Sequence, residues 1–185
     1  MVTPGKNNGR ELQEKGRQIR LLLTDCDGVL TDGSVYYSER GEEMKRFSVR
    51  DGMGAERLRK LANVEVGIVT GEVSLSLQRR AEKLGITELY LGARDKLSVL
   101  DDISERRNLK LEQIAYIGDD TNDVEVMKRV GLSACPADAT RFAKEVVDYV
   151  CENRGGYGAF RDLAEFIIAT KKDCAASPGR KEVQG

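Results

Sequence analysis

The sequence contains no histidine among its 185 residues. This absence removes the side chain that most often serves as a general base, the commonest zinc ligand, and any route through a phosphohistidine. Enzymatic chemistry in this protein must therefore come from carboxylates, lysines and hydroxyl groups.

Long apolar runs are also missing. A membrane-spanning helix needs about 18 or more consecutive apolar residues, and no stretch of the chain approaches that length. Residues 1–17 are polar and lack the apolar centre of a secretory signal peptide. We therefore expect a cytoplasmic protein without a membrane partner.

The chain has no large excess of charge of one sign and no clustered cysteines. Thirty Lys and Arg residues oppose 31 Asp and Glu residues, so the formal net charge of -1 gives no overall attraction to nucleic acid. The four cysteines have no C-x-x-C or paired spacing, which indicates neither a zinc site nor a disulfide framework. We expect them to be reduced thiols.

The pattern of apolar residues predicts one α/β domain. Residues 1–17 and 173–185 are rich in charged and small residues, which predicts flexible tails around a domain spanning 18–172. Within that domain, short apolar runs alternate with segments of helical period, as expected for a largely parallel sheet. The predicted strands are 19–24, 64–70, 88–91, 114–117 and 132–135, and the predicted helices are 52–62, 74–84, 96–107, 122–130, 141–147 and 158–171.

Residues 33–49 interrupt this alternation. Residues that favour strands lie on both sides of the turn Glu39-Arg40-Gly41, a pattern typical of a β-hairpin. Because the hairpin is inserted directly after the first strand, we expect it to act as a lid or an interface rather than as part of the sheet.

Polar residues follow the predicted strands at the points where the strands end. Ligands of a parallel α/β sheet bind at that edge, because the loops gather there. The residues concerned are Asp25 and Asp27 after the first strand, Thr70 and Gly71 after the second, Lys96 after the third, and Asp119 and Asp120 after the fourth.

This set supplies what phosphoryl transfer needs without histidine. One aspartate can attack phosphorus and form an aspartyl-phosphate. A second aspartate, two residues later, can protonate the leaving oxygen and then deprotonate the incoming water. Mg²⁺ prefers oxygen ligands and relieves the repulsion among carboxylates and phosphate, while lysine and a hydroxyl hold the phosphoryl oxygens.

Each of these residues also has an ordinary structural interpretation. Asp-x-Asp after a strand is most often a turn or a helix cap, and Thr70-Gly71 is a common turn pair. Lys96 is by default a solvated surface residue, and Asp119-Asp120 can cap the helix that follows. The occurrence of all four groups, in order, at the strand ends of one sheet favours the catalytic interpretation.

The segments DCDGVLTDG, VTG, RDK and GDDTND resemble the four motifs of the haloacid dehalogenase-like (HAD) phosphatases, over about residues 20–170. The resemblance implies a three-layer Rossmann-like sandwich with Mg²⁺ as cofactor. It implies Asp25 as nucleophile, Asp27 as general acid and base, Thr70 and Lys96 as phosphate ligands, and Asp25, the backbone carbonyl of Asp27 and Asp119 as metal ligands. Asp120 and Asp123 would support the metal or Lys96 from behind these ligands.

Longer segments are similar to a smaller group within that family. TDGSVYY, GEEMKRFSVRDGMG, LYLGARDKL and RGGYGAFRDL resemble capless phosphatases that act on 3-deoxy-D-manno-octulosonate (KDO) 8-phosphate or on 9-phosphates of nonulosonates such as KDN and sialic acid. The resemblance implies a phosphorylated acidic sugar as substrate, with KDO 8-phosphate preferred. It also implies a homotetramer in which the hairpin 33–49 packs against its copies and a neighbouring subunit helps to close each site.

The residues around the expected site leave the sugar open. Glu72 and Lys83 look more like the nonulosonate branch, whereas Arg50 looks more like the octulosonate branch. A sugar carboxylate can pair with Arg50, Arg80 or Lys83, but these side chains can equally be surface charges in weak pairs. The expected substrate-binding residues are Gly28, Arg50, Gly71, Glu72, Arg80 and Lys83.

The segment RGGYGAFRD (154–162) has two interpretations. Its glycines precede a predicted helix and could cradle an anion at the helix N-terminus, or they could form a flexible entry to that helix. Arg161 falls in the first turn, where a cation is unfavourable, so we expect a carboxylate or the substrate as its partner.

Two other functional classes share parts of this pattern. A signalling receiver domain also combines clustered aspartates, Mg²⁺, Thr and Lys, but it has its phosphate acceptor after the third strand, and no acid is found where this strand ends at Leu91. A non-catalytic assembly module with phosphatase-like sequence would not need to keep Asp25, Asp27, Thr70, Lys96 and Asp119 together.

Overall fold

The computed structural model describes residues 6–175, with side chains described for residues 9–172. Within this range the strands of the main sheet are β1 (Leu21–Thr24), β4 (Glu65–Val69), β5 (Glu88–Tyr90), β6 (Ile114–Ile117), β7 (Leu132–Cys135) and β8 (Tyr149–Val150). These six strands are parallel and lie in the order β5-β4-β1-β6-β7-β8. The predicted parallel α/β fold is confirmed. The short edge strand β8 was not predicted, because its two residues make no recognisable apolar run.

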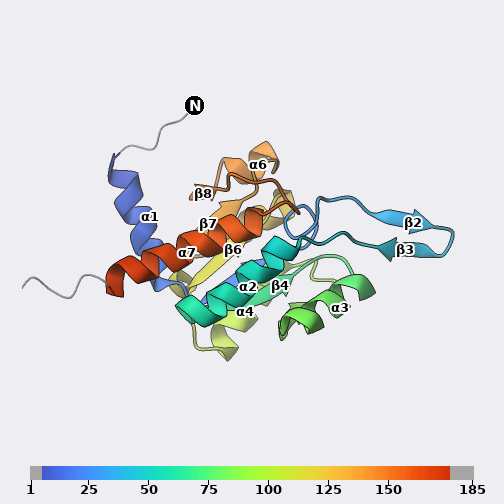
Figure 1. The fold of residues 1–185 in the computed structure, drawn as a ribbon, viewed down its shortest axis with the longest axis horizontal. Coiled ribbons are helices and arrows are strands. Elements are labelled where there is room, and N and C mark those ends of the chain that lie inside the picture. Colours follow the sequence, from blue (N-terminus) through green and yellow to red (C-terminus); the bar gives the residue numbers. More distant parts are fainter. Residues whose placement is uncertain (1–5, 176–185) are drawn as a thin grey trace, which may run out of the picture.

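Helices cover both faces of the sheet (Figure 1). One face carries α2 (Val49–Ala62), α3 (Leu75–Leu84) and α7 (Ala159–Ala175), and the other carries α4 (Lys96–Arg106), α5 (Val124–Met127) and α6 (Arg141–Lys144). Successive side chains of a strand point to opposite faces. Leu22 therefore belongs to the core under the first group of helices, and Leu21 and Leu23 to the core under the second. The result is a three-layer sandwich.

Helices α5 and α6 are shorter than the predicted helices 122–130 and 141–147. The expected start of the first is a 3-10 turn, Thr121–Asp123, and one helical turn follows in each case. Within residues 6–175, no helix combines the length and the apolar character that crossing a lipid bilayer requires.

Helix α7 lies alongside α2 (Figure 1), and the two are joined near their N-termini. The Asp51 carboxylate accepts a hydrogen bond from the backbone N–H of Arg161 at 2.9 Å. Gly54 permits close approach, since a Cβ at this position would lie 3.2 Å from Arg161 Cδ. The Arg161 guanidinium donates to Glu165 one turn later, at 2.7 Å, so this cation has the carboxylate partner that its place in the first turn led us to expect.

The prediction of a flexible tail over 1–17 is wrong for residues 6–17, which form most of α1 (Lys6–Gln18). Leu12 packs against the core beneath α7, and Lys171 Nζ donates to the carbonyl of Arg17 at 2.9 Å. The surface that stabilises α1 is provided by α7, at the other end of the sequence. The composition of residues 1–17 alone therefore cannot predict this helix. At the C-terminal end α7 continues through Ala175, beyond the predicted boundary. The predicted tail residues 1–5 and 176–185 lie outside the described residues.

The hairpin predicted over 33–49 is confirmed, with strands β2 (Tyr36–Ser38) and β3 (Gly41–Met44). It forms a separate two-stranded sheet that projects from the body of the molecule (Figure 1). Arg46 fixes its base, because the guanidinium donates to Asp32 at 3.2 Å and lies 4.3 Å from the centre of the Tyr157 ring. The hairpin is therefore a projection with a firmly attached base.

The strand order reverses at β1. The chain runs from β1 outward to β4 and β5, then returns to β6 on the other side of β1. In such sheets the loops at the carboxyl ends of the strands separate at this point and leave a crevice where ligands bind. A ligand site is therefore expected beside the residues that follow β1 and β6.

Candidate active site

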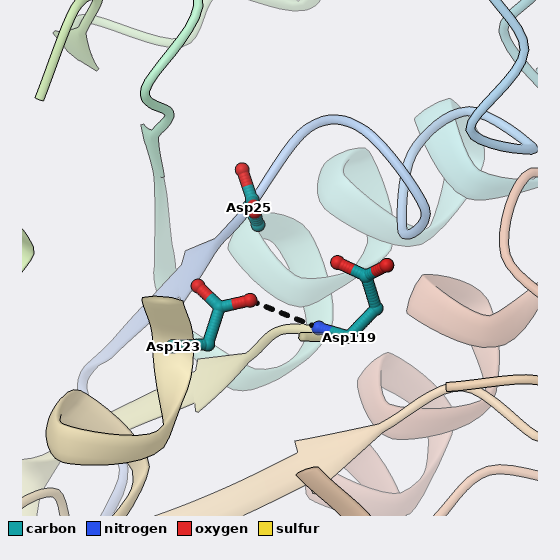
Figure 2. A group of neighbouring side chains, drawn as sticks. All are labelled: Asp25, Asp119 and Asp123. Atoms are coloured by element: carbon teal, nitrogen blue, oxygen red, sulfur yellow. Dashed lines mark hydrogen bonds between the residues drawn. The ribbon is translucent and has the colours of Figure 1, made fainter. Parts of the chain in front are cut away.

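Three aspartates meet at the carboxyl ends of β1 and β6 (Figure 2). Asp25 follows β1 directly, whereas Asp119 and Asp123 follow β6. One carboxylate oxygen from each lies within 4.8 Å of the others. Asp25 and Asp123 are buried, with 5% and 0% of their surface exposed. Water therefore screens their negative charges poorly, and the cluster favours a cation.

Lys96 supplies one positive charge to this cluster. Its Nζ donates to Asp25 Oδ2 at 2.8 Å and to Asp123 Oδ1 at 2.6 Å. Burial acts to lower the pKa of Lys96, but the two carboxylates outweigh burial and raise it. Lys96 is the first residue of α4, whose N-terminus is capped by Asp95 through a hydrogen bond from Ser98 N at 3.1 Å. The start of this helix thus fixes the ammonium group beside Asp25.

The carboxylates of Asp25 and Asp119 remain undercompensated. Burial, followed by the charge of Asp123, raises the pKa of Asp25 to about 6, although Lys96 opposes this shift. Burial, with the charges of Asp25 and Asp123, raises the pKa of Asp119 to about 7. Carboxylate oxygens are hard ligands that suit a divalent cation. Asp25 and Asp119 thus fit such a cation, which would supply the missing positive charge.

Asp123 differs from its neighbours because its oxygens already have several partners. Oδ1 accepts hydrogen bonds from Lys96 and from the Tyr116 hydroxyl at 2.6 Å, and Oδ2 accepts from the backbone N–H groups of Asp119 at 3.0 Å and Asp120 at 3.3 Å. Asp123 thereby holds both Lys96 and the loop after β6. The exposed Asp120 instead caps a 3-10 turn by accepting from Thr121 N at 2.7 Å, and among its described contacts there is none with Lys96.

Gly28 makes close approach of the two acidic loops possible. Its φ of +78° lies in the left-handed region, and a Cβ on it would be only 2.0 Å from Asp119 Oδ2. Every other residue type would displace the Asp119 carboxylate from the cluster.

Asp27 is held by a residue that the sequence analysis did not identify. Lys45 Nζ lies 2.7 Å from both carboxylate oxygens of Asp27, and the Thr31 hydroxyl donates to Oδ1 at 3.1 Å. Lys45 follows β3 and reaches back from the base of the hairpin. The available signal was a basic residue in an insertion next to the acidic loop, and that alone does not distinguish Lys45 from Arg46.

Thr70 and Gly71 open the loop after β4. Thr70 is 2% exposed, and its hydroxyl accepts a hydrogen bond from Glu72 N at 3.3 Å. Gly71 is exposed, and among the described residues no atom lies within 4 Å of a Cβ built on it, so packing against these residues does not require a glycine. The second predicted motif therefore starts from a buried hydroxyl at the same edge of the sheet as Asp25.

The predicted substrate-binding side chains differ in their surroundings. Arg50, Glu72 and Lys83 are exposed. Arg80 is engaged elsewhere, because its Nη2 donates to the carbonyl of Ser48 at 2.9 Å and its guanidinium lies over the Phe47 ring at 5.9 Å. Arg80 thus stabilises the chain just before α2.

The glycines of RGGYGAFRD pack against the acidic loop. A Cβ on Gly155 would lie 1.9 Å from the carbonyl oxygen of Gly28, and a Cβ on Gly156 would lie 2.5 Å from Asp32 N. Gly156 N donates to the carbonyl of Val29 at 2.8 Å. These glycines provide a backbone surface behind Asp27, a role that neither interpretation of the sequence included.

Comparison with known proteins agrees with this geometry. The family model for haloacid dehalogenase-like hydrolases matches residues 72–158. The 3-deoxy-D-manno-octulosonate 8-phosphate phosphatase KdsC of Escherichia coli (strain B / BL21-DE3) is 41% identical over 158 residues, which are 85% of this chain and 84% of that protein.

Two solved structures extend the comparison to the whole fold. The cobalt-bound deoxy-D-mannose-octulosonate 8-phosphate phosphatase of Haemophilus influenzae has a TM-score of 0.83 at 37% identity, covering 89% of this chain and 96% of its own. The 3-deoxy-D-manno-octulosonate 8-phosphate phosphatase of Moraxella catarrhalis, in complex with magnesium ion, phosphate ion and KDO, has a TM-score of 0.85 at 33% identity, covering 90% and 95%. With this identity over most of both chains, the protein belongs to the haloacid dehalogenase-like hydrolase family.

Proposed function

We propose that this protein is a Mg²⁺-dependent phosphomonoesterase that hydrolyses KDO 8-phosphate through an aspartyl-phosphate on Asp25. The observation that carries this proposal is the buried Asp25 carboxylate, 2.8 Å from Lys96 Nζ and beside Asp119 at the strand ends. The substrate follows from similarity: the relative from E. coli is a KDO 8-phosphate phosphatase by name, and the M. catarrhalis structure holds magnesium, phosphate and KDO.

In the first step, a carboxylate oxygen of Asp25 attacks phosphorus while the bond from phosphorus to the sugar oxygen breaks. The departing oxygen belongs to a primary alcohol, which is a poor leaving group. Asp27 acts as the general acid and transfers a proton to that oxygen. Lys96 and the Thr70 hydroxyl hold the oxygens of the transferring phosphoryl group as charge develops on them.

In the second step, water attacks phosphorus and the bond to Asp25 breaks. Asp27, now ionised, takes a proton from the water. Inorganic phosphate leaves, and the Asp25 carboxylate is regenerated. Mg²⁺, held by Asp25, Asp119 and the backbone carbonyl of Asp27, would neutralise the charge shared by the carboxylates and the phosphate.

The sugar acid is recognised by the exposed polar residues around this site. Arg50, in the first turn of α2, is the cation proposed for its carboxylate, Glu72 accepts from its hydroxyls, and the backbone of Gly28 and Gly71 faces the phosphoryl group. Lys83 is in the last turn of α3, at the opposite end of that helix from Glu72, so it is not proposed to bind the sugar in the same subunit. Arg80 contributes indirectly through its hydrogen bond to the chain before α2. The alternative substrates are KDN 9-phosphate and N-acetylneuraminate 9-phosphate.

Phosphate release from these three esters, with and without EDTA, tests the proposal. We expect EDTA-sensitive release, with kcat/KM for KDO 8-phosphate about tenfold or more above the others, since differences in sugar contacts are worth about 1–3 kcal/mol. Preference for a 9-phosphate would change the sugar and keep the reaction. Absence of metal-dependent release would favour a non-catalytic assembly module, and a long-lived phosphoenzyme would favour a receiver domain.

The active form is proposed to be a homotetramer assembled through the hairpin. The hairpin lies next to the start of α3, because the Ser74 hydroxyl donates to Glu42 at 2.6 Å. Large apolar side chains are exposed on both segments. These side chains are Tyr36, Tyr37, Met44, Val73 and Leu75. Such a concentration of exposed apolar surface is typical of an interaction site. Sedimentation velocity should give a tetramer that Tyr37→Asp dissociates, and a monomeric unaltered protein would contradict this arrangement.

A further inference from the structure

The base of the hairpin brings a buried ammonium group to Asp27. We propose that Lys45 is a positioning residue that fixes the Asp27 carboxylate, and that Glu42 and Ser74 tie this contact to the start of α3. The inference rests on the proposed function, because it takes Asp27 as the group that exchanges protons with the leaving oxygen and the water.

Lys45 contacts both carboxylate oxygens of Asp27. Its Nζ lies 2.7 Å from each oxygen of Asp27, so the ammonium sits between the two and sets the orientation of the carboxylate. The Lys45 side chain is 1% exposed, whereas that of Asp27 is 25% exposed. Asp27 is thus held from its protein side and remains open on the other.

A second carboxylate, that of Glu42, also contacts the Lys45 ammonium group. Lys45 Nζ lies 3.4 Å from Glu42 Oε2, and Glu42 Oε1 accepts a hydrogen bond from the Ser74 hydroxyl at 2.6 Å. Ser74 is 3% exposed and caps α3 by accepting from Leu77 N at 3.3 Å. This chain of contacts joins Asp27, the hairpin and the helix that follows the Thr70 loop. A buried ammonium needs such partners to offset its lost hydration.

Arg46 holds the same part of the hairpin through different partners. Its guanidinium contacts Asp32, the carbonyl of Gly156 and the Tyr157 ring. Arg46 therefore offers a matched control, because a change there weakens the attachment of the hairpin without removing the Asp27 contact.

The chemistry gives a readout that mere loss of stability would not produce. A primary sugar alcohol needs a proton as it leaves, whereas p-nitrophenolate and acetate, from p-nitrophenyl phosphate and acetyl phosphate, leave without one. Displacement of Asp27 should therefore lower kcat/KM selectively for the sugar phosphate. General damage to the site would lower kcat/KM for every substrate.

The test compares Lys45→Met with Arg46→Met on KDO 8-phosphate, p-nitrophenyl phosphate and acetyl phosphate. We expect Lys45→Met to lower kcat/KM about 100-fold for the sugar phosphate and less than about threefold for the two activated substrates, as for partial loss of general acid catalysis. Arg46→Met should affect all three substrates alike. Glu42→Gln, at a partly exposed position, should show the same selectivity at about tenfold and serves if Lys45→Met does not fold.

A double-mutant cycle gives an independent measurement. If Lys45 acts through Asp27, adding Lys45→Met to Asp27→Asn should cause almost no further loss, because groups that act as a unit are not additive. Equal losses on all three substrates, the same selectivity in Arg46→Met, or additive losses in the cycle would overturn the role of Lys45.

These outcomes separate the inference from the proposed function. If the unaltered protein hydrolyses a sugar phosphate and Lys45→Met is not selective, only the inference fails. If the preferred ester is a 9-phosphate, the same comparison applies, since that leaving group is also a primary alcohol. If the unaltered protein hydrolyses no phosphate ester, both fail.

Discussion

Metal binding by the acidic cluster should depend steeply on pH, because binding must displace protons. Burial is the largest cause that raises the pKa of Asp25 to about 6 and that of Asp119 to about 7, from an ordinary value of 3.8. A cation binds the ionised forms, so each proton held by the free protein weakens the apparent affinity. The direction is fixed by the raised values: affinity is highest at alkaline pH and falls as the pH drops through 7 and then 6.

The size of the effect follows from these two values. Lowering the pH from about 8 to about 5 costs roughly one decade of affinity at Asp25 and roughly two at Asp119, or about 1000-fold together. Two aspartates of ordinary pKa would change the affinity by less than about twofold over the same interval. At about pH 7 the same values predict the release of roughly 0.6 proton per ion bound.

Isothermal titration calorimetry with Mg²⁺, run in two buffers of different ionisation enthalpy, measures both the affinity and the number of protons released. Asp120→Asn is the control, because this neighbour is exposed and its carboxylate caps a turn. The charge of Asp120 raises the pKa of Asp119 less than burial, Asp25 or Asp123 does, so most of the pH dependence should persist. An affinity that varies less than about threefold over the interval, or proton release near zero at about pH 7, would refute the electrostatic reasoning.

Three further predictions concern the nucleophile, the acidic loop and the core. Asp25→Asn should lower phosphate release at least about 1000-fold while the melting temperature shows an intact fold, and substantial residual turnover would exclude Asp25 as nucleophile. Gly28→Ala should weaken calorimetric Mg²⁺ binding about tenfold or more, since its Cβ would lie 2.0 Å from Asp119 Oδ2, and an unchanged affinity would contradict this packing. Phe160→Ala, at a side chain 1% exposed, should reduce the free energy of unfolding in urea by about 3–5 kcal/mol. The half-exposed control Tyr157→Ala should cost less than about 1 kcal/mol, and equal costs would contradict the assigned core.

The parts of the site that could be predicted are those that depend on strand ends. Asp25, Lys96 and Asp119 each follow an apolar run, and the rule that loops gather at one edge of a parallel sheet brings them together without knowledge of side-chain contacts. The fold class followed from the same alternation of strands and helices. A tight cluster of carboxylates around one lysine is what that reasoning led us to expect, and the structure contains it.

The parts that could not be predicted depend on contacts between distant segments. The Lys45 contact with Asp27 requires the hairpin to fold back over 18 positions, and nothing in its neighbours distinguishes Lys45 from Arg46. Arg80 was expected to bind substrate, yet its described hydrogen bond goes to the carbonyl of Ser48, the residue that caps the N-terminus of α2. Helix α1 is stabilised by its contacts with α7. Its own charged sequence contains no sign of those contacts and therefore resembles a flexible tail.

The glycines at 155 and 156 have a consequence for how the protein becomes active. A nascent chain that ends before Gly155 already carries the acidic cluster and Lys96, but it lacks the backbone surface that lies against Gly28, Val29 and Asp32. It also lacks α7, which covers one face of the sheet beside α2. The carboxylates of the acidic cluster should therefore reach their final arrangement late in synthesis, as a single cooperative event. Phosphatase activity would then appear only in chains whose C-terminal segment has folded onto the start of the protein.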